Sequence, residues 1–152
     1  MLKIVLDTNV LISAFLKKGS IPSSILVLME KGLLHLCVTK EIMGEYEGVL
    51  RRAKFQSINE KALKYLKKNQ RHFITVIPKE KISALNEDPD DNIFLECSVG
   101  ARADYLLTGN IKHFPFKKYR GTAIMTPKEF IDSVSKSLFE MKKKPKRALS
   151  TN

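Results

Sequence analysis

Asp7 directly follows a short apolar run near the start of the chain and is the first side chain placed to do chemistry. The run Leu2–Leu6 is too short and too rich in branched side chains for a helix, and it lacks the alternation of a half-exposed strand. It therefore predicts a strand buried on both faces. Parallel sheets bind ligands at the carboxyl ends of their strands, where Asp7 would then lie. The alternative is that Asp7 only ends the strand or caps the next helix.

Glu45 lies on the apolar stripe of a helix predicted from Lys40 to about Arg52. Ile42 is three residues before it and Val49 is four residues after it, so all three share one face. A carboxylate on a core-facing stripe is costly unless it is paired or bound to a metal. The alternative is a flanking residue that forms a salt bridge with Arg or Lys.

A third group of carboxylates precedes a buried helix predicted at residues 93–99. Asp88, Asp90 and Asp91 fall within four residues, and Asp90 or Asp91 must lie at or beside the helix N-terminus. The helix dipole and free N–H groups favour a carboxylate there, and Asp is a common N-cap residue. Capping accounts for one aspartate but not for three.

Carboxylates gathered at one sheet edge require a cation or a proton between them, because like charges repel. Cys37 and Cys97 are isolated in apolar runs, and the histidines (His35, His72 and His113) show no metal-ligand spacing. Ligands that are all oxygen atoms favour Mg²⁺ or Mn²⁺, which activate water and stabilise charge on a phosphate. On a basic protein, such a site predicts phosphodiester chemistry on a nucleic acid.

The chain has 152 residues, a hydrophobic content of 43% and a net charge of +11. This length predicts one domain with an ample core. Five of the 27 basic residues lie in the last thirteen positions, so most of the positive excess is on the body of the chain. A basic body favours a polyanionic partner such as nucleic acid, although solubility charge on a heat-adapted protein is the alternative.

Strand patterns alternate with helical patterns along the chain, which predicts a single-domain α/β fold with a doubly wound parallel sheet. The predicted strands are residues 2–6, 33–38, 73–77, 105–108 and 123–125. We expect the domain to span residues 1–138 and a basic, flexible tail to span residues 139–152. With no apolar run of membrane length and no signal-peptide pattern, we expect a cytoplasmic protein without a membrane partner.

Four stretches, in order, resemble the motifs of PIN-domain nucleases, and within these the toxins of bacterial and archaeal toxin–antitoxin systems. They are residues 5–10, 39–46, 88–92 and 103–110, and the similarity extends over about residues 2–132. The resemblance implies a three-layer α/β/α sandwich with a five-stranded parallel sheet. It also implies an endoribonuclease dependent on Mg²⁺ or Mn²⁺, a homodimer, and an antitoxin bound across the early helices.

Carried over by position, the resemblance makes Asp7, Glu45 and Asp91 the acidic metal site and its catalytic residues. Asn110 stands where many relatives have an aspartate after Thr-Gly. It could coordinate through its carbonyl oxygen or orient a water, but it supplies no charge. Toxin-type relatives carry an acid near the position of His113, which makes binding of a second metal an open question.

Further residues are expected to complete the site. Asp88 is the extra carboxylate, while Thr8, Asn9 and Thr108 orient ligands or the phosphate. Asp104 is expected at the opposite edge of the sheet, in a structural role. Basic side chains around the opening would hold the RNA backbone through salt-sensitive contacts; they are Arg51, Arg52, Lys54, Lys112 and Lys117.

Two other functions fit parts of the pattern. A phosphatase of the haloacid-dehalogenase type also has an aspartate after its first strand. Its acid-base residue would fall at Asn9, which cannot do that work. A degenerate module that binds RNA or a partner protein without cutting is the second alternative, and the neutral Asn110 is its main support.

Overall fold

A six-stranded sheet forms the centre of the molecule, which a computed structural model describes for residues 1–85 and 88–143. The parallel strands are β1 (Leu2–Leu6), β2 (Leu34–Val38), β3 (Ile74–Thr75), β4 (Tyr105–Leu107) and β6 (Thr122–Met125). A short strand, β5 (Lys118–Tyr119), pairs antiparallel with β6 at the edge. The five predicted parallel strands are therefore present, and β5 adds a sixth.

The strand order is β3–β2–β1–β4–β6–β5, so the side on which the chain adds new strands changes at β1. The chain builds outward from β1 to β2 and β3, and it then returns to add β4 and β6 on the other side of β1. Open α/β sheets bind ligands at such a switch point, in the crevice outside the carboxyl ends of the strands. Asp7 and Thr108, which directly follow β1 and β4, lie at this crevice.

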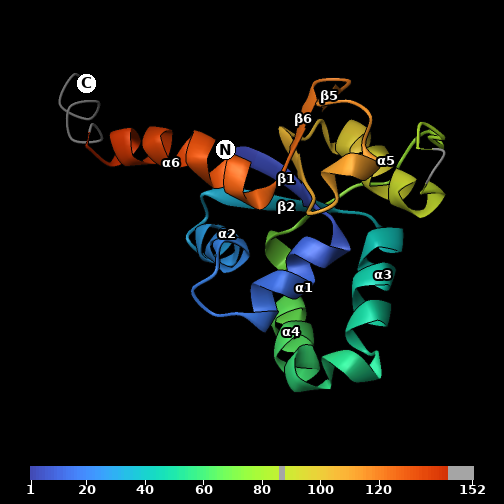
Figure 1. Cartoon of the computed structure of the whole chain (residues 1–152), viewed down its shortest axis with the longest axis horizontal. Helices are drawn as coiled ribbons and strands as arrows, with labels where there is room; N and C mark the ends of the chain where they lie inside the picture. Colours follow the sequence, from blue (N-terminus) through green and yellow to red (C-terminus); the bar gives the residue numbers. More distant parts are fainter. Residues whose placement is uncertain (86–87, 144–152) are drawn as a thin grey trace.

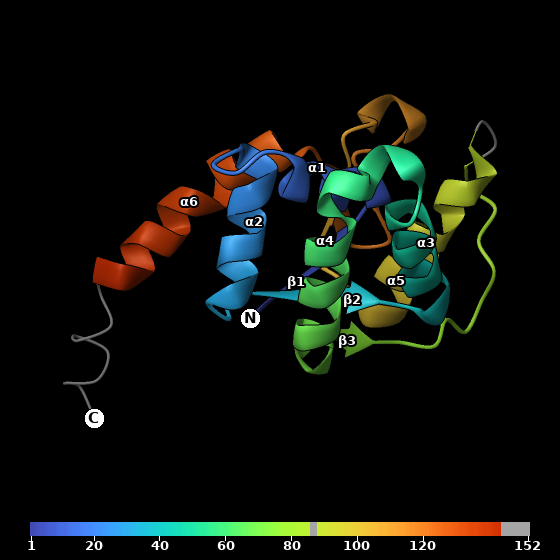
Figure 2. The same cartoon turned by 90° about the horizontal axis from the view of Figure 1, so that it is seen from below.

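Helices cover both faces of the sheet and complete the three-layer α/β/α sandwich (Figure 1). They are α1 (Thr8–Leu16), α2 (Ile21–Glu30), α3 (Lys40–Leu50), α4 (Gln56–Asn69), α5 (Asn92–Ala101) and α6 (Pro127–Lys143). Helix α5 packs on β1, β2 and β4 from one side. Figure 2 shows α2, α4 and α3 in front of the strands on the other side. Short 3₁₀ turns connect these elements; they are η1 (Ala53–Phe55), η2 (Gln70–His72), η3 (Pro89–Asp91) and η4 (Ile111–His113).

The structure differs most from the sequence-based expectation at β3, at β5 and at the end of α6. Strand β3 has two residues because its partner β2 ends at Val38, which pairs with Thr75; Ile77, at the predicted strand end, is 88% exposed. Strand β5 was missed because it is only two residues long. Arg120 and Gly121, both at positive φ, form the tight turn that folds β5 onto β6. Helix α6 runs to Lys143 and so includes the first residues of the expected tail, whose remainder, 144–152, lies outside the described residues.

Helix α1 is largely apolar and is mostly buried inside the domain, with Val10, Leu11 and Ala14 in the core. Within the described residues, no single helix is long and apolar enough to cross a membrane. In that part of the chain, α1 and α2 taken together reach such a length and composition, but a bend of 95° separates them.

Tyr46 connects α3 to the central strand. Its side chain is fully buried, as its place on the apolar stripe predicts, and its Oη atom donates a hydrogen bond of 2.6 Å to the carbonyl oxygen of Leu6. Leu6 precedes Asp7, so this bond ties the helix that carries Glu45 to the strand that carries Asp7. The core beneath the crevice therefore positions two of the expected site residues relative to each other.

We expect Tyr46→Phe to lower the free energy of unfolding by about 1–2 kcal/mol, because the buried Leu6 carbonyl loses its partner. Urea denaturation followed by circular dichroism would measure this change. Tyr105→Phe is the matched control, since its ring packs on Phe130 and its hydroxyl makes no hydrogen bond within residues 1–85 and 88–143. Equal losses in the two variants would contradict the assigned role of the Tyr46 hydroxyl.

Candidate metal site

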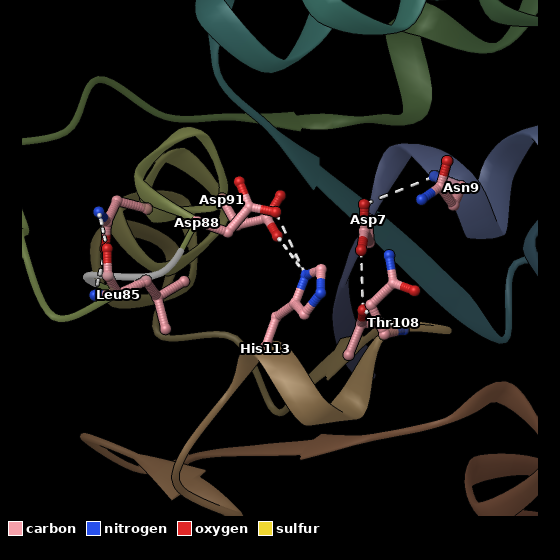
Figure 3. Close-up of polar contacts among 9 residues, drawn as sticks. Asp7, Asn9, Leu85, Asp88, Asp91, Thr108 and His113 are labelled. Carbon is pink, nitrogen blue, oxygen red and sulfur yellow. Dashed lines mark hydrogen bonds and ion pairs between the residues drawn. The ribbon is translucent and has the colours of Figure 1, made fainter.

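Asp7 lies at the carboxyl end of β1 with only 3% of its surface exposed (Figure 3). Its Oδ2 atom accepts a hydrogen bond of 2.7 Å from Thr108 Oγ1, and its Oδ1 atom accepts a longer one of 3.5 Å from the backbone N–H of Asn9. Burial raises the pKa of Asp7, and the bond from Thr108 opposes that shift. Asp7 therefore caps α1, as the alternative supposed, and it also presents a costly buried carboxylate to the crevice.

Thr108 holds both Asp7 and the turn that follows β4. Its side chain is fully buried, and its Oγ1 atom also accepts a hydrogen bond of 3.0 Å from the backbone N–H of Asn110. The Asn110 side chain is half-buried at the same edge, whereas Asn9 is exposed at the start of α1. The structure thus gathers the predicted orienting residues around Asp7, although only Thr108 bonds its carboxylate through a side chain.

Glu45 reaches the same edge from α3 and accepts a hydrogen bond from the hydroxyl of Thr8, the first residue of α1. Thr39 caps α3 at the end of β2, because its hydroxyl accepts the N–H of Ile42 at 3.1 Å. This cap begins the helix at the carboxyl edge of the sheet. Within the described residues the α3 glutamates that form salt bridges are Glu41 and Glu47, so the salt-bridge alternative for Glu45 does not hold there.

Asp91 and Asp88 approach the crevice from the segment before α5. Asp91 is the N-cap residue of α5, yet its side chain makes no capping hydrogen bond, so capping does not explain it. Its side chain is 14% exposed, and Figure 3 shows it pointing with Asp88 toward His113. His113 Nδ1 lies 3.2 Å from Asp88 Oδ2 and 3.8 Å from Asp91 Oδ2.

The electrostatics of Asp91 show that the carboxylates share one field. Its pKa is raised to about 7, first by burial and then by the charges of Asp7, Asp88 and Glu45, while His113 lowers it. The carboxylates that follow β1, on α3 and before α5 are therefore close enough to oppose the ionisation of Asp91. Near neutral pH such a group either retains a proton or attracts a cation.

Two polar side chains that hold the acidic segment were not among the predicted site residues. Asn92 accepts the N–H of Leu85 at 2.9 Å and donates to the Leu85 carbonyl at 3.2 Å, like a paired strand residue. Glu96 accepts the N–H of Ile82 at 3.0 Å. Both are buried polar residues within an apolar helix, and that pattern was the available signal.

The opposite edge of the sheet has a structural carboxylate. Asp104 accepts the backbone N–H of Lys3 at 2.9 Å, at the amino ends of β1 and β4, so it lies away from the crevice as expected. The basic residues predicted to hold RNA have exposed side chains; they are Arg51, Arg52, Lys54, Lys112 and Lys117.

A mostly apolar hollow of about 360 Å³ opens beside the crevice. Asn9 and Gly109 line this hollow, and Lys128 of α6 lies on its wall. Asn9 is two residues after Asp7, and Gly109 directly follows Thr108. The carboxylate cluster is thus bordered by a mostly apolar surface.

Comparison with known proteins agrees with this arrangement. The family model described as the PIN domain matches residues 3–112, which span β1 through β4 and the cluster of carboxylates. The chain belongs to the PIN-domain family, as its motifs indicated. The phosphatase alternative has no support in this match. A comparison with curated protein sequences finds no match.

A solved structure supports the fold. The chain is similar to a chain in the crystal structure of VapBC2 from Rickettsia felis bound to a DNA fragment from their promoter. The TM-score is 0.53, the similarity covers 81% of this chain and 97% of that chain, and the sequence identity is 18%. At this identity the likeness supports the fold alone, and it agrees with the PIN assignment.

The pKa of Asp91 predicts a pH-dependent stability in the absence of divalent ions. The folded protein holds the Asp91 proton up to about pH 7, whereas the unfolded chain releases it near 3.8. The unfolded state therefore binds fewer protons between these values, and the free energy of unfolding falls as the pH rises. With EDTA at pH 8, Asp91→Asn should raise it by about 1–3 kcal/mol, and at pH 4 it should change little.

Urea denaturation at a series of pH values would measure this effect, with Asp90→Asn as the control because Asp90 is an exposed neighbour. Adding Mg²⁺ at pH 8 should raise the free energy of unfolding of the wild-type protein toward the value that Asp91→Asn has without metal. The same pH dependence in wild type and Asp91→Asn would show that Asp91 does not carry the shift.

Proposed function

We propose that this protein is a metal-dependent endoribonuclease and the toxin member of a toxin–antitoxin pair. The observation that carries the proposal is the convergence of Asp7, Glu45 and Asp91, with Asp88, at the switch point of the sheet. Family membership supports nuclease chemistry, and the basic surface supports a polyanionic substrate.

The donor atoms fit a divalent cation. Burial raises the pKa values of Asp7 and Asp91, and the neighbouring carboxylates raise that of Asp91 further. Oxygen ligands of this kind suit Mg²⁺ or Mn²⁺. Asp7, Glu45 and Asp91 would hold the ion. Such an ion, when bound, lowers the pKa of a coordinated water and neutralises charge on a phosphate.

The remaining side chains position the reactants. Thr108 and Thr8 hold the carboxylates of Asp7 and Glu45 in fixed orientations through their hydroxyl groups. Asn9 and Asn110, at the mouth of the crevice, would orient the scissile phosphate or the attacking water. The hollow beside Asn9 would receive the nucleobase next to the cut.

Partner binding is proposed on separate grounds. Leu16, Ile21 and Val27 expose apolar side chains on α1 and α2, on the early helices where the resemblance places an antitoxin. The VapBC2 complex named above has this fold in one of its chains. We further propose a cytoplasmic homodimer in which the PIN domain occupies most of the chain.

The alternative of a non-cutting PIN module rests on Asn110, which brings no charge to the site. It predicts retained RNA binding and no cleavage with any divalent ion. The carboxylate cluster favours the nuclease, because a module that only binds RNA has no need of two neighbouring carboxylates, Asp7 and Asp91, whose ionisation is opposed.

Cleavage of a mixed RNA pool in Mg²⁺, Mn²⁺ or EDTA tests the proposal. We expect metal-dependent cutting by the wild type and a loss of more than about 100-fold in Asp7→Asn, because a ligand of the ion is removed. Asp104→Asn is the matched control, since it removes a carboxylate from the opposite edge of the same sheet. Metal-dependent cutting that survives in Asp7→Asn would contradict the assignment of the site.

A further inference from the structure

His113 presents a ring nitrogen to the acidic segment without hydrogen-bonding to it. The side chain is 41% exposed, but its Nδ1 atom is buried and has no hydrogen-bond partner within residues 1–85 and 88–143. This atom faces Asp88 Oδ2 at 3.2 Å and Asp91 Oδ2 at 3.8 Å (Figure 3). A buried nitrogen therefore faces two carboxylates without a hydrogen bond to either.

The spacing of the three side chains suits a shared ion. Each of them offers one ligand atom, and these atoms all lie within 4.8 Å of one another. Two ligand atoms at about 2.1 Å from one ion are about 3.0 Å apart when adjacent and about 4.2 Å apart when opposite. The observed separations of 3.2 and 3.8 Å fall within this range.

Short turns from two distant parts of the chain hold these ligand atoms in place. In η3 the N–H of Asp91 donates to the Asp88 carbonyl at 3.1 Å, and Asn92 anchors the segment to Leu85. In η4 the N–H of His113 donates to the Asn110 carbonyl at 2.9 Å. The ring nitrogen therefore approaches the carboxylates from the turn after β4, next to the edge where Asp7 and Thr108 lie.

We propose that His113 Nδ1 binds the divalent ion together with Asp88 and Asp91, so that this centre takes a first-row transition-metal ion such as Mn²⁺ in preference to Mg²⁺. Imidazole nitrogen suits transition metals, whereas Mg²⁺ is a hard ion that keeps oxygen ligands and gives up water reluctantly. The proposal deepens the proposed function and rests on it, because Asp91 is also one of the ligands assigned to the nuclease site.

A competing role for His113 makes the opposite prediction. If protonated His113 served as a built-in cation that neutralises Asp88 and Asp91, it would compete with any metal. His113→Gln would then raise the affinity for both Mn²⁺ and Mg²⁺. If His113 is a ligand, the same variant loses affinity for Mn²⁺ and retains its affinity for Mg²⁺.

Electron paramagnetic resonance of Mn²⁺ added to the full chain at pH 8 tests the proposal without an activity assay. In the wild type, pulsed spectra should show coupling of Mn²⁺ to a directly bound ¹⁴N nucleus, and His113→Gln should abolish it. Titration should show Mn²⁺ affinity about tenfold lower in His113→Gln, with Mg²⁺ competition within about twofold of wild type. His72→Gln is the matched control, because His72 is exposed in η2 at the opposite edge of the sheet.

The outcomes separate this inference from the proposed function. The role of His113 is overturned if Mn²⁺ binds without ¹⁴N coupling, or if the Mn²⁺ affinity of His113→Gln is unchanged or higher. In that case the nuclease site still stands if Asp7→Asn loses the ion. Coupling that His113→Gln abolishes supports His113 as a ligand even where no RNA is cut. Absence of Mn²⁺ binding in the wild type overturns both.

Discussion

The proximity of four carboxylates beyond the end of β1 is the constraint on which the rest of this structure depends. Burial, and then the charges of the neighbouring carboxylates, raise the pKa of Asp91 to about 7, and burial also raises that of Asp7. The fold tolerates this arrangement because Thr8 and Thr108 direct hydroxyl donors at two of the carboxylates and because the core beneath them is large. Neighbouring carboxylates of this kind lower the stability of the folded protein, but they also form a strong binding site for a cation.

The topology explains why these residues meet. Helix α1, helix α3 and the segment before α5 all begin at the carboxyl edge of the sheet, because each follows a parallel strand or its continuation. The reversal of strand order at β1 leaves a crevice there that neighbouring helices do not fill. Residues far apart in the sequence are thus brought to one edge by strand direction alone, and their side chains need only point outward.

Strand direction also accounts for what could be predicted from the sequence. The buried run before Asp7 and the helical spacing of Glu45 were sufficient to place both at one edge, because periodicity reports on burial. Strand β5 was not predictable, since two residues carry no period. The approach of His113 to Asp88 was also beyond the pattern, because it depends on how two 3₁₀ turns face each other across the crevice. The spacing of the histidines along the chain does not predict that contact.

The three consecutive residues Leu6, Asp7 and Thr8 are tied to different parts of the molecule. The Leu6 carbonyl accepts a hydrogen bond from the Tyr46 hydroxyl, and Asp7 accepts one from Thr108 at the end of β4. Thr8 donates a hydrogen bond to Glu45 of α3. Opening of this junction must therefore break the contacts of the strand, the neighbouring strand and the helix together, as one cooperative unit. A ligand bound in the crevice would consequently slow hydrogen exchange at the amides of the central strand, so exchange rates in the core would measure binding at the surface.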